Sequence, residues 1–338
     1  MASGVVDALL NSAEPSVRWK VRTRVLGESP RSPRNRALRE EIRNSPRVGL
    51  LLAGRGPDGR LEPRHSVYGK WFGAHWVLAA LADLGYPPGD PALVPLRDQV
   101  VDHWLRPHFF VDVELADKAA TYRHEGVPVM RGRHRRCGSQ QGNALRSVAA
   151  LGLLDDRAGR LVERLLHWQW PDGGWNCDRE PAASVSSFCE TLLPMRGLAA
   201  YADATGDGAA RRAAERATEV FLSRRLLYRR GNGQLIHPEF TRLHYPLYWH
   251  YDVLGGLVGL AEAGAITDER CADALDLLES RRLPDGGWPL QRRYYRTSPA
   301  GGTGTDLVDW SGAGPRRMNE WVTADALAVL AAAGRTTG

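Results

Sequence analysis

The sequence predicts a helical protein that is built from repeated helix pairs in two layers. Three observations support this prediction. The turn at residues 170–175 recurs at 283–288, and both copies contain Pro-Asp-Gly-Gly-Trp. Around the two copies, apolar residues are spaced by three and four positions, as on one face of a helix. The alternating pattern that marks half-buried strands is almost absent.

The two copies of the turn lie 113 residues apart, from Trp175 to Trp288. This distance fits two structural repeats of about 55 residues each. The apolar spacing predicts helix pairs over residues 17–26 and 34–42, 71–84 and 91–105, 145–154 and 158–168, 186–201 and 209–226, and 248–263 and 268–283. A last helix is expected over residues 324–333. We therefore expect five or six pairs in a single domain that spans residues 1–338.

The two members of each predicted pair differ in composition. The first members are rich in small and apolar residues, such as Ala144 and Gly256, which suit crowded inner helices. The second members carry charge on one face, such as Arg160 and Glu163, which suits an outer layer with one wet face. In the recurring turn, Pro ends the outer helix, Asp-Gly-Gly reverses the chain, and Trp packs under the next helix.

The segment Gln169-x-x-Asp172-Gly173-Gly174-Trp175 resembles the QW repeat of triterpene cyclases and the equivalent turn of protein prenyltransferase β subunits. In the second copy, Arg282 stands where Gln would. The resemblance implies an α/α toroid whose inner helices line a central active cavity. It also implies an enzyme that acts on an apolar or isoprenoid-like small molecule.

Two segments interrupt the helical pattern. A small hairpin is expected near residues 120–133, and the stretch 297–314, rich in Gly, Pro and Thr, is expected to be a surface loop over the mouth of the cavity.

Composition excludes several classes of protein. The net charge is +6, but Lys occurs only at Lys20, Lys70 and Lys118, and an Arg bias of this kind is typical of a GC-rich genome. Motifs for nucleic-acid binding and for nucleotide cofactors are absent. We find neither an apolar run long enough for a membrane span nor a secretory signal. The four Cys therefore indicate reduced thiols, and we expect a cytoplasmic protein with a small-molecule substrate.

Potential metal ligands lie where the inner helices are expected to begin. Because all inner helices of a toroid begin at the same end, these residues should converge there: Cys137, Cys177, Asp178, Cys189 and His250. Thiolate and imidazole are ligands that Zn²⁺ prefers. Protein prenyltransferases hold a catalytic zinc with Asp, Cys and His. The resemblance implies Cys189 or Cys177 as the Cys, Asp178 as the Asp and His250 as the His.

Two other interpretations of these thiols remain open. Reduced Cys packs readily as a small apolar residue. A thiol could also be a nucleophile that His250 and the helix N-termini activate.

Basic residues precede Cys137. Arg133, Arg135 and Arg136 would lie near inner-helix N-termini, where partial positive charge favours a diphosphate or carboxylate group. The alternative is a solvated basic loop.

Aromatic residues are concentrated in two expected inner segments. Trp76 lies in one, and Tyr245, Tyr248 and Trp249 lie in the other. Aromatic faces stabilise cations, which favours a cavity for carbocation chemistry. The alternative is ordinary core packing.

Several features leave the reaction open. Triterpene cyclases protonate their substrate with an Asp-x-Asp-Asp motif, which is absent, since Asp306 and Asp309 are separated by two residues. This absence argues against squalene-type cyclisation. A lyase or hydrolase on the same scaffold could use His250, Asp252 and Glu190, with Cys189 nearby, for acid–base work on a polar substrate. A non-catalytic binding protein is the third interpretation.

Overall fold

The computed structural model describes residues 2–62, 66–297 and 303–335. Its α-helices are α1 (Ala2–Leu10), α2 (Pro15–Lys20), α3 (Pro33–Arg43), α4 (Pro46–Leu52), α5 (Ala74–Leu84), α6 (Val94–Trp104), α7 (Gly138–Ala150), α8 (Arg157–Trp168), α9 (Phe188–Thr205), α10 (Gly208–Leu222), α11 (Val253–Glu262), α12 (Ala272–Ser280) and α13 (Glu320–Ala332). A π-helical segment, η1 (Val21–Val25), continues α2. The predicted helical pairs are thus present, while α1 and α4 were not anticipated.

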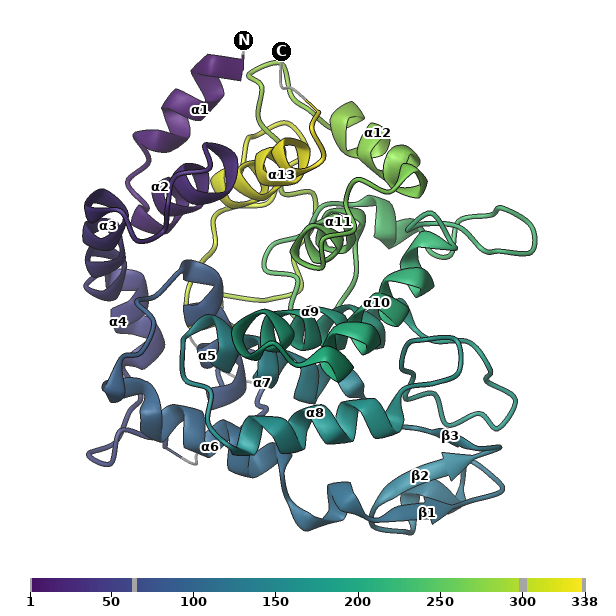
Figure 1. The fold of residues 1–338 in the computed structure, drawn as a ribbon. Helices are drawn as coiled ribbons and strands as arrows, with labels where there is room; N and C mark the ends of the chain where they lie inside the picture. Colours follow the sequence, from purple (N-terminus) through teal and green to yellow (C-terminus); the bar gives the residue numbers. More distant parts are fainter. Residues whose placement is uncertain (1, 63–65, 298–302, 336–338) are drawn as a thin grey trace.

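The helices form a ring of neighbours (Figure 1). Along the inner side, α5 packs on α7, α7 on α9, α9 on α11, α11 on α13, and α13 on α2 and η1. Lys20 at the end of α2 lies 4.0 Å from Asp83 of α5, which brings the two ends of the series together. Each of α3, α6, α8, α10 and α12 packs against an inner helix that precedes it in the chain.

The recurring turn connects α8 to α9 and α12 to α13. The indole nitrogen of Trp175 donates to the carbonyl of Leu165 at 2.9 Å, and its backbone N–H donates to Thr191 Oγ1 of α9 at 3.1 Å. Trp288 repeats both contacts, to Leu278 at 2.7 Å and to Thr323 of α13 at 2.9 Å. Both indoles are fully buried. The predicted packing of Trp beneath the next helix is therefore confirmed.

Two features of the fold correct the prediction. The chain is not entirely helical, because β1 (Asp112–Glu114), β2 (Val127–Met130) and β3 (Arg133–His134) form a small sheet. The expected hairpin corresponds to β2 and β3, which pair antiparallel, whereas the parallel pairing of β1 with β2 was not foreseen. The helix expected from residue 248 begins only at Val253, because Tyr248 adopts a φ of 53°.

The segment expected to be a surface loop is partly interior. Of the residues that the structure describes there, Asp306, Val308 and Trp310 are buried, and the residues between them are exposed. The buried residues of this segment pack against the ring, and the chain bends at Leu307 and Val308. In the described parts of the chain, we find no helix that is long and apolar enough to cross a membrane.

Candidate functional site

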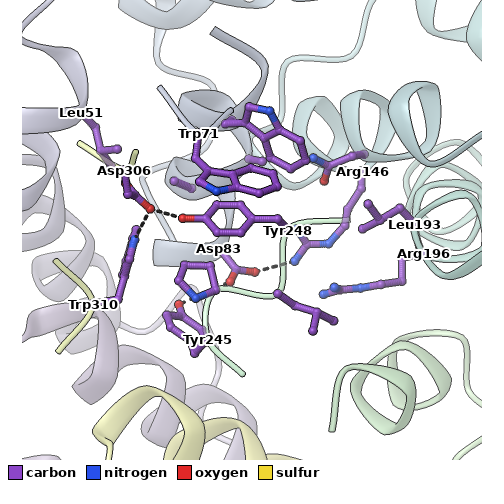
Figure 2. A pocket seen from close by; sticks show the side chains of 16 residues that line it. Leu51, Trp71, Asp83, Arg146, Leu193, Arg196, Tyr245, Tyr248, Asp306 and Trp310 are labelled. Atoms are coloured by element: carbon purple, nitrogen blue, oxygen red, sulfur yellow. Dashed lines mark hydrogen bonds and ion pairs between the residues drawn. The ribbon is translucent and has the colours of Figure 1, made fainter. Parts of the chain in front are cut away.

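A pocket of about 600 Å³, part of it open to solvent, lies inside the ring. Its walls come from α4, α5, α7 and α9, from Trp71 just before α5, and from two loops, 245–248 and 306–310. Figure 2 shows the two loops meeting opposite the charged side chains of the inner helices. One side of the pocket is therefore aromatic, and the other side is charged.

The aromatic side surrounds the carboxyl group of Asp306, which is only 8% exposed. The indole nitrogen of Trp310 donates to Oδ2 at 2.7 Å, and the hydroxyl of Tyr248 donates to the same oxygen. The backbone N–H of Val308 donates to Oδ1 at 3.1 Å. Burial raises the pKa of Asp306, although the hydrogen bonds from Tyr248 and Trp310 act in the opposite direction. This carboxyl group thus holds a proton more readily than an ordinary Asp.

Tyr248 also forms part of an aromatic wall. Its ring stacks on Trp71 with centroids 3.8 Å apart (Figure 2). Trp71 also meets Trp76 edge to face, with centroids 4.8 Å apart. Trp76, Tyr245 and Tyr248, which the sequence suggested as substrate-binding residues, all line the pocket. Trp249 does not line it, and stacks instead on His250 at 3.9 Å.

The charged side, formed by Asp83, Arg146 and Arg196, belongs to a larger cluster to which each inner helix contributes one residue. We call it the charged cluster, and its members are Lys20, Asp83, Arg146, Arg196, Glu262 and Asp325. Arg146 pairs with Asp83 at 2.7 Å and lies 3.9 Å from Glu262. Arg196 makes two bonds to Glu262, at 2.6 and 2.8 Å. The three positive and three negative charges balance, so the cluster joins the inner helices without excess charge.

The charged cluster predicts how stability depends on pH. Burial opposes ionisation of Glu262, but Arg196 and Arg146 outweigh it and lower its pKa to about 2 from 4.5. A lowered folded-state pKa contributes stability that is present above 4.5 and is lost as the pH falls through 2. In urea unfolding at a series of pH values, the stability difference between wild type and Glu262→Gln should therefore shrink from pH 5 to pH 2. A stability difference that stays constant between pH 5 and pH 2 would contradict the lowered pKa of Glu262.

A second group lies at the mouth, the end of the ring where α7 and α9 begin. The ligand atoms of Cys137, Cys177 and Glu190 all lie within 4.8 Å of one another. Cys137 directly precedes α7, Cys177 follows the first recurring turn, and Glu190 lies in the first turn of α9. We call this the mouth cluster. It contains two of the predicted metal ligands, together with a residue expected to be an acid–base group.

The other predicted ligands lie elsewhere. Among the described residues, neither Asp178, Cys189 nor His250 joins a group of three potential ligands. His250 is sandwiched between Trp249 and Tyr294, with ring centroids at 3.9 and 3.5 Å, and burial lowers its pKa to about 4. Asp178 is exposed. Burial raises the pKa of the Cys189 thiol to about 12, so this thiol is not activated.

Asp252, which the sequence suggested for acid–base work together with His250 and Glu190, is hydrogen-bonded to other groups. Asp252 caps α11 by accepting the N–H of Gly255 at 2.7 Å. Its other oxygen accepts the backbone N–H of His244 at 2.7 Å and lies 3.2 Å from Nδ1 of that residue. Asp252 is therefore a buried helix cap that is paired with His244.

The basic residues before Cys137 separate from one another. Arg135 is buried and donates to the carbonyls of Ala183, Met130 and Pro181. Arg133 lies on β3, away from the central pocket. Only Arg136 is near the mouth cluster, where burial lowers its pKa and the acidic groups of that cluster oppose the effect. These three residues thus do not build one anion site.

A third group of potential ligands lies on the outside of the ring. Nε2 of His167, at the end of α8, is 2.6 Å from Asp112 Oδ2 of β1, and Nε2 of His134 on β3 is 3.1 Å from the same oxygen. These contacts tie the small sheet to α8.

Sequence reasoning missed Asp306 and the charged members of the pocket wall, Asp83, Arg146 and Arg196. No periodic pattern in the sequence marks Asp306, because the exposed Leu307 beside it is as apolar as the buried Val308. The three charged residues interrupt apolar inner helices, which is itself a sign of a buried polar role.

No family model and no curated protein matches this chain. One similar solved structure is a variant of the type II terpene cyclase MstE from Scytonema in complex with its substrate geranylgeranyl dihydroxybenzoate. It is 16% identical, the match covers 88% of this chain and 99% of that one, and the TM-score is 0.29. A TM-score this low decides neither the fold nor the activity of this chain.

Proposed function

We propose that this protein is an α/α-toroid enzyme that acts on an apolar, isoprenoid-like small molecule in the central pocket, with Asp306 as the proton donor. The observation that carries the proposal is the buried carboxyl group of Asp306, which stands in an aromatic pocket and has a raised pKa. A protonated carboxyl group in such surroundings is suited to general acid catalysis.

The proposed reaction begins with transfer of the Asp306 proton to one carbon of a C=C bond. This leaves a cation on the other carbon and a carboxylate on Asp306. The rings of Trp71, Trp76 and Tyr248 line the pocket, and the face of an aromatic ring stabilises positive charge. Hydrogen bonds from Tyr248 and Trp310 hold the carboxylate. A second C=C bond then attacks the cation, which forms a C–C bond and moves the positive charge to a new carbon. Loss of a proton from a neighbouring carbon to water forms a new C=C bond, and a proton from water returns to Asp306.

The test is turnover of linear isoprenoid alkenes in D₂O. A product that carries one solvent deuteron is expected from the wild type. Asp306→Asn should lower the rate by roughly 10²–10⁴-fold, the usual contribution of a general acid. The matched control is Asp309→Asn, because Asp309 lies three residues on and its side chain is 59% exposed. Equal activity of Asp306→Asn and wild type would refute the proposal, and binding without turnover would favour a non-catalytic binding protein.

The pH profile offers a separate prediction. Activity requires protonated Asp306, so it should fall as the pH rises through the pKa of that group. Tyr248→Phe keeps the stacked ring but removes a hydrogen bond that lowers this pKa. The pH of half-maximal activity should therefore move upward in Tyr248→Phe. In Tyr245→Phe it should not move, because the Tyr245 hydroxyl donates to Asp83 instead, at 3.4 Å. A downward or equal shift in both variants would contradict the assignment.

A second candidate function has one observation in its favour. Asp83, Arg146 and Arg196 form part of the pocket wall, which suits a substrate with a polar end. Under this alternative the protein is a lyase or hydrolase that acts on a polar substrate, with Asp306 as the acid. Turnover of polar substrates, together with no turnover of isoprenoid alkenes, would favour it.

A further inference from the structure

The mouth cluster contains three groups that are able to bind a cation, and they come from three separate segments. Sγ of Cys177 lies 3.3 Å from Glu190 Oε1, and Cys137 lies within the same 4.8 Å group. Glu190 is buried, and both Cys are half-buried. Two thiols and a carboxylate form a donor set that suits Zn²⁺ and related metals, for which Cys sulfur and carboxylate oxygen are usual ligands.

The backbone around the mouth cluster is firmly held. Trp175, two residues before Cys177, is fixed by its bonds to Leu165 and Thr191. The side-chain amide of Asn176 donates to the carbonyl of Val185 at 2.9 Å. The second oxygen of Glu190 accepts the backbone N–H of Ser139 in α7 at 3.2 Å. The three ligand groups are therefore positioned by the recurring turn and by two helix starts, and they need no rearrangement of the chain to approach one ion.

The electrostatics of the mouth cluster favour a cation. The potential ligand atoms of Cys137, Cys177 and Glu190 lie within 4.8 Å of one another, so three potential anions are crowded together. A divalent ion would remove this repulsion. Two thiolates and one carboxylate carry three negative charges, and a divalent metal with the guanidinium of nearby Arg136 supplies three positive ones.

We propose that Cys137 Sγ, Cys177 Sγ and a carboxylate oxygen of Glu190 bind one divalent metal ion of the zinc type. Three protein ligands leave one position of a tetrahedral site for water or for a heteroatom of a substrate. The ligand set differs from the one that the sequence suggested. Cys189 is excluded, although it neighbours Glu190, because consecutive helix residues point in directions about 100° apart. The proposal does not depend on the acid chemistry of Asp306.

The test uses the full-length protein without a histidine tag, reduced and treated with a chelator. Titration with Co²⁺ should produce the near-ultraviolet thiolate-to-cobalt absorption at a stoichiometry of one, and Zn²⁺ should abolish it. Cys137→Ser and Cys177→Ser should each lose the absorption, and Glu190→Gln should weaken Zn²⁺ binding by roughly tenfold or more. Circular dichroism and melting curves would establish that each variant is folded.

Matched controls separate this site from the alternatives. Cys189→Ser should keep full cobalt absorption, because its thiol lies outside the mouth cluster. His167→Ala removes the outer group and should also leave the absorption unchanged. The proposal is overturned if wild type gives no thiolate absorption. It is also overturned if metal binding survives Cys137→Ser but is lost in His167→Ala, or if the reduced protein re-forms a Cys137–Cys177 disulfide in place of binding metal.

Discussion

Replacing Gly197 by alanine is expected to lower the free energy of unfolding by about 3 kcal/mol, the upper end of the usual range for overpacking. A Cβ atom on Gly197 of α9 would lie 2.3 Å from the carbonyl oxygen of Gly142 in α7. In the other direction, a Cβ on Gly142 would lie 2.4 Å from the backbone nitrogen of Pro194. Both contacts are with backbone atoms, so the helices must separate to relieve them.

The separation should also affect the pocket. Four residues that line the pocket lie close to this contact. They are Asn143 and Arg146 on α7 and Leu193 and Arg196 on α9. Chemical denaturation of Gly197→Ala measures the free energy of unfolding. Binding of an apolar dye reports whether the pocket changes when the helices separate.

Gly159→Ala is the matched control. Gly159 lies within α8, and the nearest atom to an added Cβ is the Tyr201 hydroxyl at 3.8 Å. Because alanine is favoured over glycine in a helix, this variant should gain about 0.5–1 kcal/mol. If both variants lost similar stability, the close approach of α7 and α9 would not be the cause.

Much of the fold follows from patterns that the sequence shows directly. The pairs α7 with α8 and α9 with α10 were predicted within a few residues of their ends, apart from the start of α7, because their apolar spacing is regular. The turn at Trp175 was predicted as a helix-to-helix connection because Pro, Gly and Trp have distinct physical roles there. The start of α11 was predicted too early, because the aromatic residues of the preceding loop continue the helical spacing although Tyr248 leaves the helical region.

The site was less predictable than the fold. We expected residues at the starts of inner helices to lie close together. This expectation was correct for Cys137 and Cys177, since each lies beside the beginning of an inner helix. It failed for His250, because the direction of a side chain in a loop depends on its tertiary contacts, here stacking against Tyr294, which residue spacing does not encode. Asp306 was passed over because its segment has no periodic neighbours in the chain, and its partners Tyr248 and Trp310 are set by tertiary structure.

The charged cluster gives the other large expected effect. Lys20 has a side chain that is 1% exposed, and its ammonium group lies 3.0 Å from Asp325 and 4.0 Å from Asp83. Asp325→Asn removes the closer partner and leaves a buried cation with incomplete compensation. We expect a loss of about 3–5 kcal/mol in the free energy of unfolding, the usual cost of breaking a buried pair from one side. Urea unfolding at neutral pH measures it.

A double variant tests whether the loss of stability comes from the unpaired charge. Lys20→Met with Asp325→Leu removes both charges, and apolar replacement of a buried pair is often nearly neutral. Most of the lost stability should therefore return, since Asp83 keeps Arg146 at 2.7 Å. The surface pair Arg211–Asp203 is the control, with side chains 51% and 62% exposed, and Asp203→Asn should cost at most about 1 kcal/mol. An equally small loss in Asp325→Asn would mean that water reaches Lys20. The charged cluster would then be a solvated wall of the pocket, and would not be a buried link between the inner helices.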